Sequence, residues 1–316
     1  MANSFALALH GGAGTIAPGS ASDEAPYRAA LLEALAAGQA VLEQGRSALD
    51  AVVAAVVSLE DCPLFNAGHG AVYTSDEQHE LDAGVMDGST LAAGAVAIVR
   101  TIRNPILAAL EVMRDGRSVI LGSENAERFA RERGLQMVEP SYFDTPHRLA
   151  QLRTVQATAG DRAVVDHDAA AATDEESPKF GTVGAVARDR QGHLAAATST
   201  GGLTNKMPGR ISDTSAVGAG VYANDATCAV SCTGTGERFI RACVAYDIHA
   251  RMRYLNQDVA MAARDSVVYG LEAIGGRGGV IVVSRDGDLA MPFNSTGMYR
   301  AWIRECEPPR TAIFAD

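Results

Sequence analysis

The sequence lacks long hydrophobic runs and an excess of positive charge. No apolar stretch approaches the roughly 20 residues that a membrane-spanning helix needs. Lys and Arg number 27 against 38 Asp and Glu, so the formal charge is -11. Such a surface repels phosphate backbones and anionic lipid headgroups. We therefore expect neither a nucleic acid nor a membrane as partner, and instead a small-molecule ligand.

Cysteine is also scarce. The five cysteines are odd in number and dispersed along the chain: Cys62, Cys228, Cys232, Cys243 and Cys306. The first ten residues contain neither a basic leader nor a cleavage site that follows an apolar stretch. These features predict a cytoplasmic protein without a disulfide framework.

Several common catalytic motifs are missing as well. There is no Gly-x-Ser-x-Gly elbow, His-Glu-x-x-His, Walker loop or Cys-x-x-Cys. Cys228 and Cys232 fall on one face of a predicted strand, where free cysteine acts as a small buried hydrophobe, so they do not indicate a metal site. We expect no organic cofactor.

What is present is a chain of ordinary globular composition. Its 316 residues are 47% hydrophobic and 21% charged, which is enough for one large domain or two smaller ones. Apolar patterns predict strands over 5–10, 93–99, 118–121, 182–188, 194–198, 217–222, 226–232, 279–284 and 289–292, and a glycine loop over 10–14. Helical spacing predicts helices over 27–42, 47–59, 105–113, 125–133, 235–253 and 257–273.

The composition changes over residues 159–179, where acidic residues and four alanines replace the periodic pattern. This change predicts a flexible linker that ends about residue 181. A strand-rich half follows it. Because strands and helices cluster as well as alternate, a helix-covered sheet sandwich and a doubly wound parallel sheet both fit the pattern.

The junction Gly181-Thr182 is a candidate site for nucleophilic chemistry. A threonine hydroxyl is a poor nucleophile unless a base lies beside it, and cleavage of the preceding peptide bond would free an α-amine on the same residue. The alternative is an ordinary strand start, since threonine favours strands.

Two glycine-rich turns carry weaker signals. Gly234-Thr-Gly236 precedes a predicted helix and is either an anion or oxyanion site or a plain helix-start turn. His10 with its two glycines is similar to an esterase oxyanion loop, but without a serine elbow a tight turn is favoured.

Several longer motifs resemble the plant-type L-asparaginases, also called isoaspartyl peptidases, of the N-terminal nucleophile (Ntn) hydrolases. The resemblance covers nearly the whole chain in order, except the linker and the last residues. Its motifs are His10-Gly-Gly-Ala-Gly14, Cys62-Pro-Leu-Phe-Asn-Ala-Gly68, Met86-Asp-Gly88, Arg103-Asn-Pro105, Gly181-Thr-Val-Gly-Ala-Val186, Ala196-Ala-Thr-Ser-Thr-Gly-Gly202, Asn205-Lys-Met-Pro-Gly-Arg210, Ser231-Cys-Thr-Gly-Thr-Gly-Glu237 and Pro292-Phe-Asn294.

The resemblance implies an αββα sandwich, in which two stacked sheets lie between helical layers. It implies self-cleavage into an α subunit of residues 1–181 and a β subunit of residues 182–316, which together form one domain. The implied function is hydrolysis of β-aspartyl peptides and L-asparagine, which releases L-aspartate. The family also implies a dimer of αβ units.

The resemblance assigns the site residue by residue. Thr182 matches the nucleophile, Thr200 its hydrogen-bonding partner, and Thr233 with Gly234 the oxyanion hole. Arg210 matches the residue that binds the substrate α-carboxylate. The α-ammonium is assigned to Asp213 with the carbonyl of Gly236, and Asn66 matches an asparagine near the oxyanion region.

The loop at 59–69 matches the family's sodium site. Its implied ligands are backbone carbonyl oxygens, which suit a hard cation; they belong to Leu59, Glu60, Cys62, Phe65, Ala67 and His69. Two alternatives stay open: a glycosylasparaginase-type amidohydrolase, and a non-catalytic metabolite-binding protein on the same scaffold. The intact Thr182 argues against the second.

Overall fold

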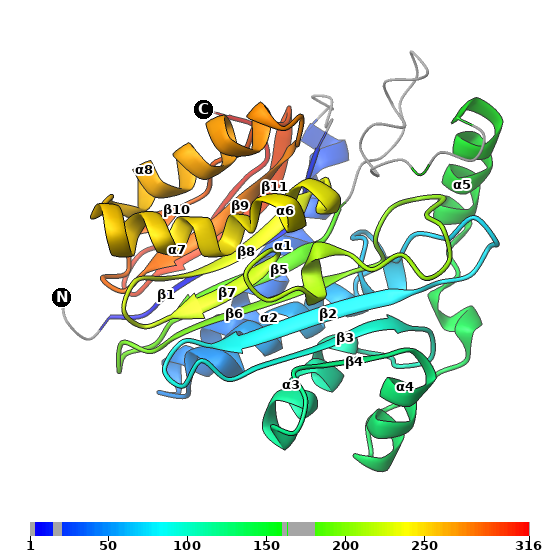
Figure 1. The fold of residues 1–316 in the computed structure, drawn as a ribbon, viewed down its shortest axis with the longest axis horizontal. Helices are drawn as coiled ribbons and strands as arrows, with labels where there is room; N and C mark the ends of the chain where they lie inside the picture. The colour runs from blue at the N-terminus through cyan, green and yellow to red at the C-terminus, as the bar shows by residue number, and fades with distance from the viewer. Residues whose placement is uncertain (1–3, 15–20, 160–162, 164–180, 316) are drawn as a thin grey trace.

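Two β-sheets lie face to face between two layers of helices (Figure 1). The computed structural model describes residues 4–14, 21–159, 163 and 181–315. The expected αββα sandwich is confirmed, and the doubly wound parallel sheet is not present among these residues.

The larger sheet has eight strands in the order β12-β11-β1-β5-β6-β2-β3-β4. Its pairings are antiparallel except between β3 and β4, which run parallel. The strands are β1 (Ala6–Gly14), β2 (Leu81–Asp87), β3 (Ala93–Val99), β4 (Ile120–Gly122), β5 (Val183–Arg188), β6 (Leu194–Thr200), β11 (Gly297–Arg304) and β12 (Arg310–Ala312).

The smaller sheet has four antiparallel strands in the order β10-β9-β8-β7. They are β7 (Val221–Asn224), β8 (Cys228–Gly234), β9 (Gly278–Ser284) and β10 (Leu289–Ala290). The helices are α1 (Ala21–Glu43), α2 (Ala48–Asp61), α3 (Pro105–Asp115), α4 (Ser123–Glu132), α5 (Pro146–Ala159), α6 (Gly236–Ala242), α7 (Val244–Leu255) and α8 (Val259–Arg264), which continues as a π-helical segment, Asp265–Leu271.

The two-residue alternation of strands explains the layers. Along β1, Leu7 and Leu9 join the core under the helices of the larger sheet, whereas Ala6 and Ala8 face the smaller sheet. Many residues between the sheets are alanines: Ala6, Ala8, Ala196, Ala223 and Ala229. Small side chains let two sheets approach closely, so the space between them is thin and fully packed.

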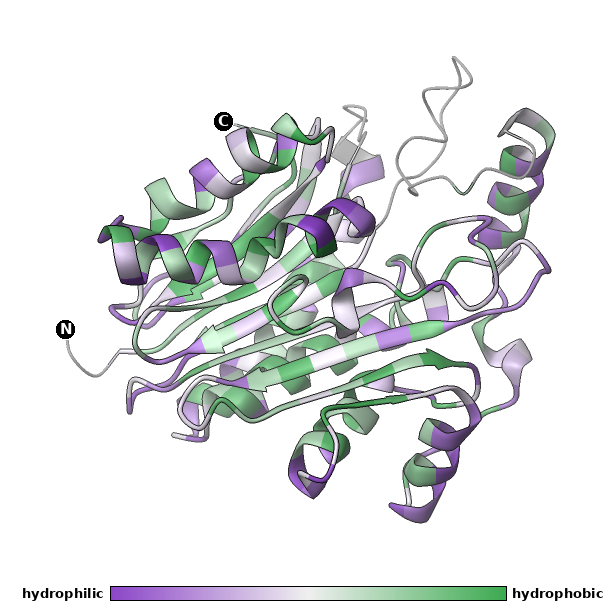
Figure 2. Ribbon diagram, viewed as in Figure 1, coloured by the Kyte–Doolittle hydropathy of each residue, from purple (hydrophilic) through white to green (hydrophobic). Residues whose placement is uncertain are grey.

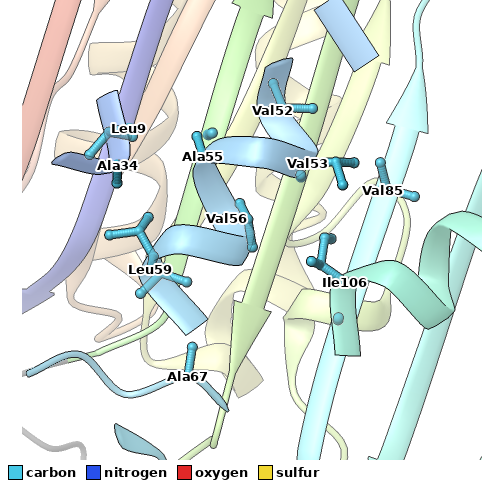
Figure 3. Packing of buried hydrophobic residues seen from close by; sticks show 14 of the residues in the cluster. Leu9, Ala34, Val52, Val53, Ala55, Val56, Leu59, Ala67, Val85 and Ile106 are labelled. Carbon is cyan, nitrogen blue, oxygen red and sulfur yellow. The ribbon is translucent and has the colours of Figure 1, made fainter. Parts of the chain in front are cut away.

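Helix α2 shows how the outer layer is attached. Its Val52, Val56 and Leu59 are fully buried in the cluster that also contains Leu9 of β1 and Ile106 of α3 (Figure 3). On the other side, α6, α7 and α8 cover the smaller sheet. Hydropathy colouring shows apolar strands between helices whose outer faces are polar (Figure 2).

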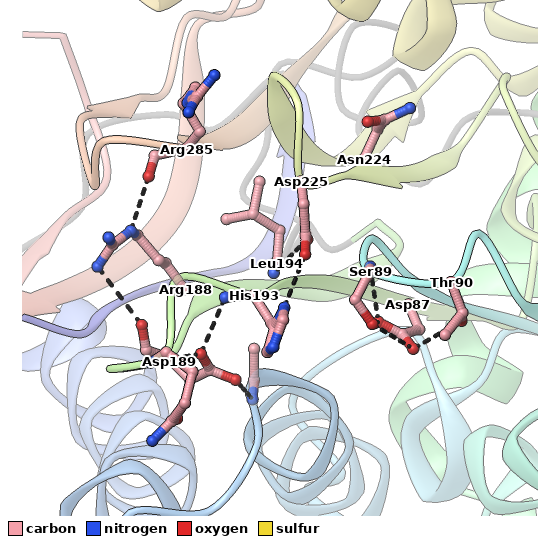
Figure 4. A network of polar contacts seen from close by, with 12 residues as sticks. Asp87, Ser89, Thr90, Arg188, Asp189, His193, Leu194, Asn224, Asp225 and Arg285 are labelled. Atoms are coloured by element: carbon pink, nitrogen blue, oxygen red, sulfur yellow. Dashed lines mark hydrogen bonds and ion pairs between the residues drawn. The ribbon is translucent and has the colours of Figure 1, made fainter. Parts of the chain in front are cut away.

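A polar network closes one end of the sandwich (Figure 4). Asp225, after β7, accepts hydrogen bonds from His193 and from the Leu194 amide, both at 2.8 Å. Arg188 at the end of β5 donates to the carbonyl of Arg285 at 2.8 Å. These contacts tie the two sheets together at the end opposite Thr182, which precedes β5.

Several predicted boundaries are wrong. The glycine loop expected over 10–14 is part of β1, because a bulge between His10 and Gly12 keeps the strand paired with β11. The helix expected over 235–253 is broken at Cys243, which has a left-handed φ of 48°.

Other elements had no predicted counterpart: β2, α5, β11 and β12. The predicted linker lies mostly outside the described residues, at 160–162 and 164–180. Within the described part of the chain, no helix is both long and apolar enough to cross a membrane.

Candidate active site

Three strands and the residue before a fourth place hydroxyl and imidazole side chains between the sheets. These side chains lie at the end of the sandwich opposite the polar network of Figure 4. In β1, β6 and β8 the alternating face that carries alanine toward the other sheet ends in His10, Thr200 and Thr233. Thr182 enters this space from the residue before β5. Its Oγ1 donates to the Oγ1 of Thr200 at 3.0 Å, and both residues are buried.

Gly12 packs directly on the residue that precedes Thr182. A Cβ at Gly12 would overlap the backbone of Gly181, and the φ of Gly12 is +113°, where only glycine is unstrained. The bulge in β1 therefore brings bare backbone against the Gly181–Thr182 bond. A side chain at position 12 would displace the Gly181–Thr182 bond.

Thr200 is held by the corner that follows β6. Its Oγ1 also accepts from the amide of Gly202 at 3.0 Å. Asn66 fixes that corner, since its Nδ2 donates to the Gly202 carbonyl at 2.7 Å and its Oδ1 accepts from Val72 at 3.0 Å. Both the nitrogen and the oxygen of the Asn66 side-chain amide thus bond to backbone groups. This pattern indicates that Asn66 supports the loop beside the site.

Thr233 and Gly234 lie at the end of β8. The Oγ1 of Thr233 accepts from the amide of Ala13 at 3.3 Å, which leaves its own proton available for donation. Gly234 has a φ of +148°, and a Cβ there would overlap the carbonyl of Arg277. This close packing fixes the backbone next to the hydroxyl, as an oxyanion-binding pair requires.

Arg210 and Asp213 flank Gly236 without pairing with each other. A Cβ at Gly236 would lie 2.7 Å from both the Nη2 of Arg210 and the Oδ1 of Asp213. The guanidinium instead uses its Nε to contact Glu237 at 2.9 Å, and Glu237 is half exposed. A cation and an anion that face each other across a glycine, without an ion pair between them, form a site for a zwitterion.

Asp213 is electrostatically unsatisfied. It is 2% exposed, and its Oδ2 has no hydrogen-bond partner among the described residues. Burial raises the pKa of Asp213 to about 7, although Arg210 opposes the shift. A bound ammonium group would supply the missing partner and lower this pKa.

We therefore expect Asp213→Asn to raise the thermal midpoint at pH 8 by several degrees while it removes substrate binding. The native pKa of about 7 lies above the ordinary 3.8, so the native state binds more protons between these values and loses stability as pH rises through them. Scanning calorimetry at pH 5 and pH 8 measures the effect, and the gain should shrink at pH 5. An asparagine variant less stable than wild type at pH 8 would contradict an unpaired carboxylate.

The segment expected to be a loop over 59–69 begins in the last turn of α2, and the loop proper follows Asp61. Two of its glycines pack tightly on backbone carbonyls. Cβ atoms at Gly68 and Gly70 would overlap the carbonyls of Glu60 and Phe65. The His69 ring packs on Tyr142, with centroids 4.9 Å apart. No group of three or more His, Cys, Asp or Glu side chains fit for a metal occurs in the described part of the chain.

The side chain of Glu60 ties this loop to β6. Its Oε1 accepts from the Oγ of Ser199 at 2.6 Å, next to Thr200. Burial raises the pKa of Glu60 to about 8, so this carboxyl is protonated at pH 7. The loop therefore offers neutral oxygens, and it contacts the site through Ser199.

Sequence reasoning gave no role to a buried triad beneath Thr182. The Nε2 of His10 lies 2.8 Å from the Oγ of Ser231, which lies 2.9 Å from the Oγ1 of Thr198. Burial lowers the pKa of His10 to about 3, so its ring is neutral. The alternation that places Thr200 and Thr233 between the sheets also predicts the inward positions of Thr198 and Ser231, two residues deeper in β6 and β8.

Comparisons with known proteins agree with this geometry. A family model described as asparaginase matches residues 3–313. The isoaspartyl peptidase of Salmonella typhimurium strain LT2 is 54% identical over 316 residues, which cover 99% of this chain and 100% of that protein. The isoaspartyl peptidase of Escherichia coli strain K12 is 53% identical, with 98% and 96% covered.

A plant protein is similar as well. The probable isoaspartyl peptidase/L-asparaginase 2 of Arabidopsis thaliana is 37% identical over 317 residues, which cover 95% of this chain and 96% of that protein. Both the family model and these relatives span nearly the whole sequence. The chain therefore belongs to the asparaginase family of hydrolases.

Proposed function

We propose that this chain cleaves its own Gly181–Thr182 bond and then hydrolyses isoaspartyl peptides and L-asparagine to L-aspartate. The observation that carries the proposal is that Arg210 and Asp213 lie across Gly236 without pairing with each other, and that the Oδ2 of Asp213 has no hydrogen-bond partner among the described residues. A free α-amino acid end, with one carboxylate and one ammonium, satisfies both. The names of the relatives support the same substrates.

Maturation begins at Thr182. Its Oγ attacks the carbonyl carbon of Gly181, the C–N bond breaks, and the acyl group moves from nitrogen to oxygen. Water then hydrolyses the ester, which leaves a carboxyl on Gly181 and a free α-amine on Thr182. Residues 1–181 and 182–316 become the α and β subunits of one domain.

Hydrolysis of substrate uses the same hydroxyl with the new amine as base. The amine takes the Oγ proton, and the oxygen attacks the side-chain carbonyl of the aspartyl group. The hydroxyl of Thr233 and the amide of Gly234 stabilise the oxyanion, at a typical value of a few kcal/mol per donor. The leaving amine takes the proton, and water releases L-aspartate from the ester on Thr182.

A sodium ion in the 59–70 loop is part of the proposal. The backbone carbonyls of Glu60 and Phe65 lie in one short segment with the protonated Glu60 carboxyl and the packed His69 ring. These neutral groups fit a singly charged hard cation held by backbone oxygens. Its place would be structural, since Ser199 and Asn66 connect the loop to Thr200 and Gly202. Equal thermal midpoints in sodium chloride and choline chloride would contradict it.

We also infer a dimer of αβ units in the cytoplasm. Helices α6 and α7 expose large apolar side chains that a second copy would cover: Ile240, Tyr246, Tyr254 and Leu255. All five cysteines are free, which fits a reducing compartment. Sedimentation equilibrium of the matured protein tests the dimer, and a particle of one αβ unit would contradict it.

The substrate assignment predicts strong discrimination between isomeric dipeptides. β-Asp-Leu presents a free α-carboxylate to Arg210 and its side-chain carbonyl to Thr182. α-Asp-Leu has no free α-carboxylate on that residue and presents the wrong carbonyl, so we expect its kcat/KM to be lower by at least about a hundredfold. L-asparagine should be cleaved less efficiently than β-Asp-Leu, and L-glutamine poorly.

Steady-state assays of the four compounds on matured enzyme decide the matter. Equal hydrolysis of the two Asp-Leu isomers would overturn the anchoring by Arg210 and Asp213. Strong binding of L-aspartate without turnover of any compound would favour the non-catalytic alternative.

A further inference from the structure

Lys206 is a fully buried lysine close to the site, and the sequence analysis gave it no role. It lies four residues before Arg210, and its side chain is among the largest that are completely buried. Its Nζ donates to the carbonyl oxygen of Glu80 at 2.6 Å. Among the described residues no carboxylate oxygen lies within 4 Å of this ammonium.

This arrangement is unusual because a lysine is almost never fully buried unless it is paired. Burial lowers the pKa of Lys206 to about 8, so the side chain is still mainly charged at pH 7. Asp82 and Glu80 favour the charged form, whereas Arg210 and Arg100 oppose it. His79 also faces this charge, and its own pKa is lowered in part by it.

The ammonium lies behind the corner that supports the nucleophile. A Cβ at Gly202 would be 2.9 Å from the Nζ of Lys206 and 3.3 Å from the Nη1 of Arg210. Both cations therefore contact one side of Gly202, whose amide donates to Thr200. The guanidinium then extends from Gly202 to Gly236, where the zwitterion site is.

The segment that carries Arg210 is tied to two buried carboxylates beside β2. The amide of Gly209 donates to Glu80 and the amide of Ser212 donates to Asp82, both at 2.8 Å. Arg100 also pairs with Glu80, at 2.6 Å, from a partly exposed position. Lys206 supplies a fully buried positive charge that interacts favourably with both carboxylates.

We propose that Lys206 is a positioning residue that sets the affinity of Arg210 for the substrate α-carboxylate. It does not touch substrate, because no part of its side chain is exposed. It holds the Gly202 corner against β2, repels the guanidinium toward Gly236, and adds positive potential where the carboxylate binds. The proposal rests on the proposed function, since it takes Arg210 as the carboxylate anchor.

Two ligands separate this role from a general structural one. L-aspartate carries the α-carboxylate, whereas β-alanine keeps the ammonium and the other carboxylate of aspartate but lacks that group. In Lys206→Met we expect the dissociation constant of L-aspartate, measured by calorimetry, to rise about tenfold. The constant for β-alanine should change less than twofold. KM for β-Asp-Leu should rise together with the dissociation constant of L-aspartate. The value of kcat should stay within about threefold of wild type, and self-cleavage should proceed.

Arg100→Met is the matched control, because it removes the other cation beside Glu80, which is partly exposed and is not among the groups that pack on Gly202. We expect it to change neither ligand's constant by more than twofold. Equal weakening of both ligands in Lys206→Met would mean a general distortion and overturn the proposal, and so would no weakening of either.

A measurement on wild type keeps the proposal testable if the methionine variant does not fold. Between pH 7 and pH 9 the ratio of the two dissociation constants should shift against L-aspartate as Lys206 loses its proton. Titration of the ligand ammonium and of the Thr182 amine affects both ligands alike. Lys206→Arg, which stays charged, should abolish the shift, and a ratio constant in wild type would overturn the proposal.

Calorimetry needs no turnover, so the outcome is distinguishable from failure of the proposed function. A wild-type protein that binds L-aspartate but cleaves no β-aspartyl bond would refute the hydrolase, and would leave the aspartate-to-β-alanine comparison intact.

Discussion

Thr182→Ala should remain a single uncleaved chain without hydrolase activity. The hydroxyl is the atom that attacks Gly181 and later the substrate, and an alanine has nothing to transfer the acyl group to. Both reactions therefore stop together, while the fold persists because the side chain is small and its hydroxyl donates one hydrogen bond, to Thr200. Intact mass spectrometry and a β-Asp-Leu assay on the same sample measure the two reactions.

Thr182→Ser is the matched control because it keeps the hydroxyl. We expect it to self-cleave, at a reduced rate, since the missing methyl group leaves the hydroxyl less fixed between the sheets. An alanine variant that still splits at residue 181, or a fully active wild type that never splits, would refute Thr182 as the nucleophile.

Arg210→Ala should separate the two reactions. The bond between Gly181 and Thr182 offers no free α-carboxylate, so self-cleavage does not need the guanidinium. Substrate does need it. Loss of one buried partner of a charged pair commonly costs about 2–5 kcal/mol, which is roughly 30-fold to several thousandfold in kcat/KM.

Two further consequences follow from the position of Arg210. Without it, Asp213 and Glu237 lose their nearby cation, so the pKa of Asp213 should rise further and binding of the substrate ammonium should weaken as well. Arg241→Ala, an exposed change on the same helix as Glu237, serves as control. A cleaved Arg210 variant with near-normal kcat/KM would show that another group binds the α-carboxylate.

The alternation of apolar residues along the strands is what makes the fold readable from sequence. Strands such as Val183–Arg188 and Leu194–Thr200 were predictable because Val, Leu and Ala predominate in them and a turn separates the two. Strand β2 was not predictable, because the two aspartates and the glycine in Leu81–Asp87 interrupt the apolar pattern. Asp82 is buried there because two backbone amides bond to its carboxylate.

The candidate site could be located from sequence only in part. The motif match placed Thr182, Arg210 and Asp213, and the structure brings them to one end of the sandwich. Contacts between residues that are distant in the sequence could not be predicted from it. The unpaired Oδ2 of Asp213 and the buried Nζ of Lys206 become visible when burial and partners are known.

The strand order gives the cleaved molecule a further property. β1 lies between β11 and β5, and β6 pairs with β2, so strands from before and after Thr182 are interleaved within the larger sheet. After the proposed cleavage the two polypeptides would therefore both contribute strands to the larger sheet and share one hydrophobic core. The smaller sheet belongs wholly to residues 182–316, but its inner face packs on Ala6, Ala8 and Met86 of the other fragment. Separating the two fragments would therefore expose the shared cores and unfold the enzyme.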